Sequence, residues 1–113
     1  MDAPALADQQ CRPLSGVSSQ LPLDVVAKAM PELPGWELAE ECQALVKTFH
    51  FDDYYRTLAF VNALAHVAHS QDHHPDLSVH YNRCAVRYST HDAGGLTAND
   101  LICAAKAERL FNN

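Results

Sequence analysis

One long segment without glycine or proline, from Asp52 to about Gln71, most constrains what this chain can fold into. Its apolar residues recur at three- and four-residue spacing, which predicts an amphipathic helix: Phe60, Val61, Leu64, Val67 and Ala68. Asp52 or Asp53 can cap its start, and Pro75 predicts an end near His73 or His74. Because such a helix must bury its apolar stripe against another layer, we expect the flanking segments to supply a sheet.

Two pairs of β-favouring segments flank this helix, one pair on each side. They combine bulky apolar residues with polar ones, largely in alternation: Trp36–Leu38, Ala44–Phe51, Leu77–Tyr81 and Val86–Thr90. Asn82-Arg83 is expected to turn the chain between the last two. Shorter helices are predicted after Pro22 and after Thr97, which forms a capping-box pattern with Asp100.

The predicted order is therefore helix, strand, strand, helix, strand, strand, helix. Two successive strand–strand–helix units favour an α+β fold, with a four-stranded antiparallel sheet and about three helices packed on one face. A chain of 113 residues fits one domain. Residues 1–19 have little hydrophobic periodicity and contain Pro4, Pro13 and Gly16, so we predict a flexible N-terminal arm before a single domain at 20–113.

Composition excludes several classes of function. The formal net charge of −6 argues against nucleic acid as a partner, because phosphate binding needs a clustered basic face. The apolar runs are too short to span a bilayer, and the N-terminal residues do not resemble a signal peptide. The four cysteines are scattered without a CxxC pair, so we expect free thiols and a cytoplasmic protein.

Histidines are the most unusual feature, with six of the seven between His66 and His91. Asp72-His73-His74-Pro75 lies at the junction of the long helix and the third strand, and Ser89-Thr90-His91-Asp92 ends the fourth strand. If these strands pair as a hairpin, both motifs lie at the same end and can share a pocket. Because histidine titrates near pH 6.5, two of them can supply one acid and one base at neutral pH.

Three other interpretations of these residues were weighed. His66 and His80 are best explained as surface histidines. His66, His69 and His73 have i, i+3, i+7 spacing that can hold zinc, copper or nickel, but no established metal motif accompanies them, and we expect no metal. A cysteine nucleophile is disfavoured, because the cysteines near the histidines in sequence lie in regular elements with apolar neighbours: Cys84 and Cys103.

These motifs resemble the pterin-4a-carbinolamine dehydratase family. The resemblance covers roughly residues 20–111 and includes the element order. It rests on these residues: Asp72-His73-His74-Pro75, Tyr81-Asn82, Ser89-Thr90-His91-Asp92, Gly95, Asp100, Pro34-Gly35-Trp36 and Phe49-His50-Phe51. A lone His-His-Pro would be weak evidence, whereas the whole series at this spacing is specific.

The resemblance implies dehydration of a 4a-hydroxytetrahydropterin to quinonoid dihydropterin, in the recycling of the pterin spent by an aromatic amino acid hydroxylase. It makes His73, His74 and His91 the catalytic histidines, with His73 and His91 as the proton-transfer pair and His74 holding the ring and hydroxyl. It implies pterin binding by the residues beside them: Asp72, Pro75, Ser89, Thr90 and Asp92. No cofactor is implied, since the pterin is the substrate. The family fold is usually a tetramer assembled through sheet edges and helices, so a homodimer or homotetramer is expected.

The family also offers two alternative functions. Some members are dimerisation partners that stabilise a transcription factor, a role expected on exposed helix faces. Others could act on a different pterin, for instance in molybdopterin metabolism. The sequence departs from many members at His69, where they carry Glu, which should lower the pKa of His73 relative to a Glu neighbour, and at Leu77, where they carry Trp.

Overall fold

The structure, a computed structural model, describes residues 5–112, so residues 1–4 of the predicted arm and Asn113 lie outside the described part. The α-helices are α1 (Leu23–Ala29), α2 (Tyr54–Gln71) and α3 (Ala98–Phe111). The strands are β1 (Glu37–Ala39), β2 (Ala44–His50), β3 (Asp76–Val79) and β4 (Arg83–Tyr88). Single 3-10 turns lie among them: η1 (Leu6–Asp8), η2 (Val17–Ser19), η3 (Met30–Glu32) and η4 (His91–Ala93).

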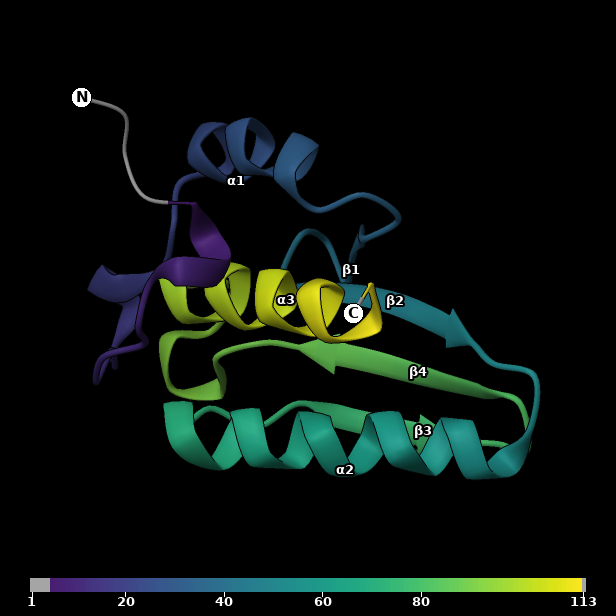
Figure 1. Ribbon diagram of the computed structural model, residues 1–113. Helices are drawn as coiled ribbons and strands as arrows, with labels where there is room; N and C mark the ends of the chain where they lie inside the picture. Colours follow the sequence, from purple (N-terminus) through teal and green to yellow (C-terminus); the bar gives the residue numbers. More distant parts are fainter. Residues whose placement is uncertain (1–4, 113) are drawn as a thin grey trace.

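The strands form one antiparallel sheet in the order β1-β2-β4-β3. Figure 1 shows α2 and α3 side by side across one face of this sheet, with α1 beside the β1 edge. The predicted α+β architecture and element order are confirmed. Because β4 pairs with both β2 and β3, its carboxyl end emerges from the interior of the sheet, where a following loop can reach several elements.

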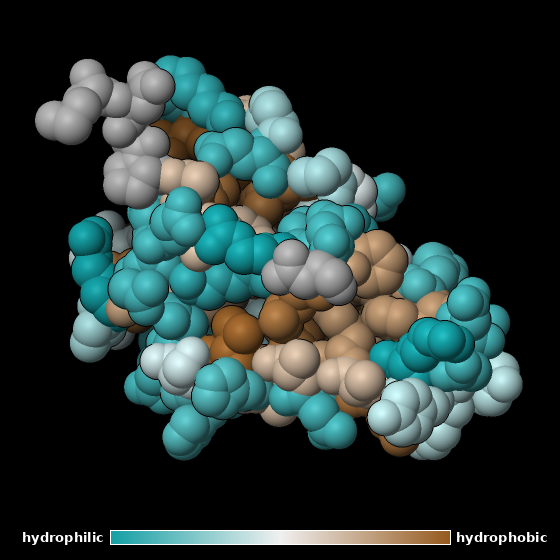
Figure 2. Space-filling view, viewed as in Figure 1, coloured by the Kyte–Doolittle hydropathy of each residue, from teal (hydrophilic) through white to brown (hydrophobic). Residues whose placement is uncertain are grey.

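The core lies between the sheet and these helices. In α2 the buried apolar residues Phe60, Leu64 and Ala68 are four apart, as the predicted stripe requires. The sheet contributes Leu45 and Phe49 among others, and each large apolar side chain buried in this way stabilises the fold by about 1.5–3 kcal/mol. Figure 2 shows an apolar band between α3 and α2, within a largely hydrophilic face.

The long helix begins as predicted and ends earlier than expected. The Asp53 carboxylate accepts a hydrogen bond from the Arg56 backbone N–H at 2.8 Å and caps the first turn. The helix ends at Gln71, and Asp72 adopts a left-handed conformation with φ of 51°. Pro75 predicted an end near His73 or His74, and the helix ends two residues before His73, the nearer of the two. No helix within residues 5–112 is long and apolar enough to cross a membrane.

The hairpin of β3 and β4 is confirmed, but its turn is shifted. Leu77 pairs with Val86, and the chain turns over residues 80–82 instead of at Asn82-Arg83. Arg83 belongs to β4 because it pairs with His50 of β2. The pairing of β4 with β2 therefore extends β4 by this residue beyond its pairing with β3. The alternation of apolar and polar residues cannot show this, because it contains no information on the pairing of β4 with β2.

The described part of the arm lies against the domain. The Lys106 side chain on α3 donates a hydrogen bond to the Ala7 carbonyl at 2.9 Å, and Arg109 forms an ion pair with Asp8 at 2.8 Å. Farther along, the Gly16 N–H bonds to the carbonyl of Asp92. The arm therefore follows α3 towards the loop after β4. Its flexibility in solution stays a prediction that hydrogen exchange would test.

Candidate active site

A pocket of about 660 Å³ opens where the arm, the end of α2 and the loop after β4 meet. Most residues that the sequence predicts for the site line it: Asp72, His73, His74, Ser89, Thr90, His91 and Asp92. Pro75 is not among the lining residues. The two histidine motifs are thus brought together at one end of the hairpin, as their placement at element ends predicted.

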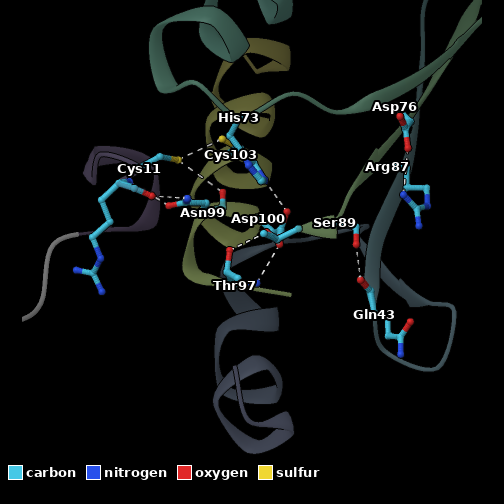
Figure 3. A network of polar contacts seen from close by, with 12 residues as sticks. Cys11, Gln43, His73, Asp76, Arg87, Ser89, Thr97, Asn99, Asp100 and Cys103 are labelled. Atoms are coloured by element: carbon cyan, nitrogen blue, oxygen red, sulfur yellow. Dashed lines mark hydrogen bonds and ion pairs between the residues drawn. The ribbon is translucent and has the colours of Figure 1, made fainter. Parts of the chain in front are cut away.

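The end of α2 aims His73 into the molecule. Asp72 takes the left-handed conformation, which aspartate tolerates better than most residues, and its N–H bonds back to the carbonyls of Ala68 and His69. The His73 N–H also bonds to the Ala68 carbonyl, at 3.1 Å. This turn carries the chain away from the helix axis, so that the His73 ring points towards α3 (Figure 3).

His73 is held by a buried carboxylate. Its Nε2 lies 2.6 Å from Oδ1 of Asp100, in the first turn of α3. The ring also lies nearly parallel to that of Tyr88, with the centroids 5.9 Å apart and 9° between the planes. Within residues 5–112 the other ring nitrogen, Nδ1, has no hydrogen-bond partner. The imidazole is therefore held by Asp100 at Nε2, and His73 also lines the pocket.

The carboxylate itself is fixed by the start of α3. Oδ2 of Asp100 accepts hydrogen bonds from the Thr97 N–H at 2.9 Å and from the Thr90 hydroxyl at 2.7 Å. Thr97 is the N-cap residue, and Asp100 completes the predicted capping box. Asp100 is fully buried, so these bonds and His73 replace its solvation. One residue thus caps a helix and orients a histidine.

The environment of His73 favours its protonated form. Burial alone would lower the pKa of His73, but the hydrogen bond and charge of Asp100 outweigh it, and Cys11 and Asp72 act in the same direction. The net result is a pKa raised above the ordinary value. At neutral pH a larger fraction of this imidazole carries the second proton than in a free histidine.

His91 reaches the pocket from the loop after β4. It begins η4, which Gly94 ends in a left-handed conformation with φ of 75°. Thr90 and Gly95 form an isolated antiparallel bridge that closes the loop. His91 and His74 are exposed, in contrast to the enclosed His73. The two sides of the pocket thus offer histidines in different environments.

Polar groups suited to a flat ligand lie around these histidines. The carboxylates of Asp72 and Asp92 are exposed at the pocket. Ser89 donates its hydroxyl hydrogen to the Gln43 carbonyl at 2.9 Å, which ties the pocket to the loop between β1 and β2. An acidic rim of this kind can accept hydrogen bonds from an amino-substituted heterocycle.

One wall of the pocket comes from residues that sequence reasoning did not include. The arm contributes residues 11–15, and α3 contributes Asn99. Asn99 bonds both the N–H and the carbonyl of Arg12, at 3.2 and 2.7 Å. No local pattern could indicate a contact between residues so far apart in sequence. Asp100 was noted only for its helix cap and as part of the family resemblance, and its contact with His73 follows from the fold.

The remaining histidines lie elsewhere. His66 and His69 are exposed on α2 and do not line the pocket, and His73 has turned away from them. The three-histidine stripe considered from the sequence is therefore not formed. Within residues 5–112 no group of three or more His, Cys, Asp or Glu side chains is arranged to hold a metal ion.

Fold and pocket together define a small α+β domain with a histidine-lined site suited to proton transfer. The family model described as pterin 4 alpha carbinolamine dehydratase matches residues 19–110. This chain belongs to that family, whose members are hydro-lyases.

Individual relatives agree with this assignment. A protein of Xanthomonas campestris pv. campestris (strain B100), provisionally named pterin-4-alpha-carbinolamine dehydratase, is 59% identical over 107 residues, which are 95% of this chain and 91% of the relative. A protein of Xanthomonas axonopodis pv. citri (strain 306) with the same provisional name is 58% identical over the same shares. The crystal structure of a transcriptional coactivator/pterin dehydratase from Brucella melitensis superimposes with a TM-score of 0.77 at 30% identity, over 80% of this chain and 97% of that one.

Proposed function

We propose that this protein dehydrates a 4a-hydroxytetrahydropterin to the quinonoid dihydropterin, with His73 and His91 as the proton-transfer pair. The observation that carries the proposal is the His73–Asp100 contact at the wall of a pocket that His74 and His91 also line. Membership of the dehydratase family supports the same chemistry. The Brucella protein is also named a transcriptional coactivator, but no feature of this pocket favours that role, so dehydration is the function proposed.

The two protons of the reaction have different requirements. Departure of the hydroxyl from C4a needs a proton on the leaving oxygen, and formation of the new C=N bond needs removal of the proton on N5. Because Asp100 raises the pKa of His73, this histidine keeps its second proton to higher pH and is available as a proton donor at neutral pH, so we assign it to the leaving oxygen. His91 is then the base. A positioned acid or base typically accelerates such a step by about 10²–10⁴-fold.

The substrate would be held by its ring. We assign the donor-rich edge of the pterin to Asp72 and Asp92. Ser89 and Thr90 complete this binding surface, and His74 holds the ring and its hydroxyl group. Proton transfer by these side chains needs no metal or organic cofactor, so activity is expected to survive chelation. In the cell the product would return to an aromatic amino acid hydroxylase, in the cytoplasm.

The test is stopped-flow dehydration of freshly generated 4a-hydroxytetrahydropterin, measured with and without a chelator. His73→Ala and His91→Ala are each expected to lower kcat by about 10²-fold or more. His66→Ala is the matched control, because His66 is exposed on α2 and lies outside the pocket.

A native acceleration that survives the chelator, is kept in His66→Ala and collapses in both pocket variants would establish the mechanism. No acceleration by folded native protein would refute the proposed function. Loss of activity on chelation, restored by a metal ion, would refute the metal-free mechanism only.

A further inference from the structure

Two cysteines from opposite ends of the chain meet beside the pocket. Sγ of Cys11 in the arm lies 3.4 Å from Sγ of Cys103 in α3, although 92 positions separate them in sequence. Figure 3 shows both thiols close to His73. The other two cysteines are elsewhere, Cys42 in the loop between β1 and β2 and Cys84 within β4.

Hydrogen bonds to two elements of the domain hold the backbone at Cys11 and at the next residue. The Cys11 N–H donates to the side-chain oxygen of Gln71, at the end of α2, at 2.8 Å. The next residue, Arg12, is bonded twice by Asn99, at the start of α3. Two elements of the domain thus hold the arm where its thiol faces Cys103. Such long-range anchoring indicates a specific approach of the two sulfurs rather than a chance contact of a loose segment.

The two thiols differ in access and in acidity. Cys11 is half-buried and lines the pocket, whereas Cys103 is fully buried. The close contact with the Cys103 thiol, together with the charges of His73 and Lys106, lowers the pKa of Cys11 against the opposing effects of burial and Asp100. The same contact, with burial, raises the pKa of Cys103. The more accessible and more acidic thiol, that of Cys11, is therefore the nucleophile.

We propose that Cys11 and Cys103 are a redox-active dithiol, which hydrogen peroxide entering the pocket oxidises to an intramolecular disulfide that fastens the arm to α3. The Cys11 thiolate attacks one peroxide oxygen; an S–O bond forms, the O–O bond breaks, and hydroxide leaves and is protonated to water. The Cys103 sulfur then attacks the Cys11 sulfur; the S–S bond forms, the S–O bond breaks, and the second hydroxide leaves as water with the Cys103 proton. Two thiols thus give up two electrons, and one molecule of hydrogen peroxide is reduced.

The proposed dithiol joins one cysteine of the N-terminal arm to one cysteine of the domain. The family match begins at residue 19, so Cys11 lies outside the segment that the family model describes. The sulfurs must approach from 3.4 Å to about 2.05 Å, a movement that the arm can make without disturbing the sheet. Cys103 is one helical turn after Asp100, so the disulfide would tie the arm to the helix that holds His73.

The experiment exposes the reduced protein to a few equivalents of hydrogen peroxide, followed by mass spectrometry of the intact chain and of its peptides. The native protein is expected to lose about 2 Da and to yield a Cys11–Cys103 linked peptide, reversed by dithiothreitol. Cys103→Ser should stop at a sulfenic acid on Cys11, trapped by dimedone. Cys11→Ser should give no dimedone adduct on Cys103. Cys42→Ser is the matched control and should form the disulfide like the native protein.

Thermal unfolding gives a second measurement that does not depend on any enzymatic activity. Oxidised native protein should unfold at a temperature higher by about 5 °C or more than reduced protein, because the cross-link closes most of the chain into a loop. The shift should be absent in both single variants. Oxidation of Cys42 before Cys11, a disulfide between two chains, or dimedone labelling of Cys103 in Cys11→Ser would each overturn the proposal.

Discussion

At the scale of single residues, the carboxylate of Asp100 serves two neighbours at once. Oδ1 faces His73, and Oδ2 accepts the hydrogen bond from the Thr97 N–H that caps α3, together with one from the Thr90 hydroxyl. Asp100→Asn keeps the shape and removes the charge, so we expect kcat for pterin dehydration to fall by about 10²-fold. Because the group is buried, the free energy of unfolding should fall by about 1–3 kcal/mol.

Stopped-flow kinetics and urea unfolding measure these two effects separately. Asp24→Asn is the matched control, since Asp24 is exposed in the first turn of α1 and does not line the pocket. An Asp100→Asn protein with native kcat would show that the contact with His73 has no part in the reaction.

The pH dependence of stability belongs to the same pair. The pKa of His73 is higher in the folded protein than its ordinary value, so folding favours its protonated form. Its contribution to stability is fully present below the unfolded pKa, about 6.5, and is lost as pH rises through the raised folded pKa. In Asp100→Asn the pKa of His73 should fall and this loss should shrink. NMR titration of the His73 ring and urea unfolding from about pH 5.5 to 8.5 would test it, and an unchanged pKa would contradict the assigned cause.

A site residue could be predicted only where residues close to it in sequence mark its position. His73 and His91 were found because each follows an element end that the sequence marks, with Pro75 and with the alternation of β4. Their convergence needed only a hairpin. Cys11 and Asn99 could not be found in this way, because their contact joins the two ends of the chain and depends on tertiary packing.

At the scale of elements, the loop between β4 and α3 places His91, and Gly94 makes its turn possible. Gly94 has φ of 75°, and a Cβ there would meet nothing within 4 Å, so any cost of a side chain comes from the backbone alone. We expect Gly94→Ala to lower the free energy of unfolding by about 1–2 kcal/mol. Gly94→Asn should cost less, because asparagine tolerates the left-handed region. Urea unfolding of the two variants decides this, and equal losses would contradict it.

The element boundaries show where sequence patterns are sufficient. The capping signals of α2 and α3 were correct because a cap is a contact between residues three apart, at Asp53 and Thr97. The end of α2 and the turn after β3 were misplaced by one or two residues. In both cases the boundary coincides with a contact to another element. His73, beyond the end of α2, contacts Asp100 of α3, and Arg83 pairs with His50 of β2 and so lengthens β4.

At the scale of the whole molecule, the sheet has an edge that the described chain leaves uncovered. β3 is the last strand in the order, and Leu77 and Val79 on it are 37% and 39% exposed. Free backbone groups beside exposed apolar side chains are a template for pairing with another strand. The family resemblance led us to expect a homodimer or homotetramer. We propose that this edge pairs with the same edge of a second copy, because a contact between two identical surfaces forms a closed dimer.

Val79→Lys should therefore convert the oligomer to monomer, because a charged side chain on an edge strand opposes pairing. Light scattering coupled to size-exclusion chromatography would measure the mass, and circular dichroism would confirm that the variant is folded. Val17→Lys is the matched control: Val17 is 75% exposed in the arm, which contributes no strand to the sheet, and its substitution should leave the mass unchanged. If Val79→Lys stays oligomeric, the copies must meet through another surface, and the helix faces become the next to vary. If the native chain is itself a monomer, the exposed edge serves no self-association, and the expectation taken from the family is wrong for this protein.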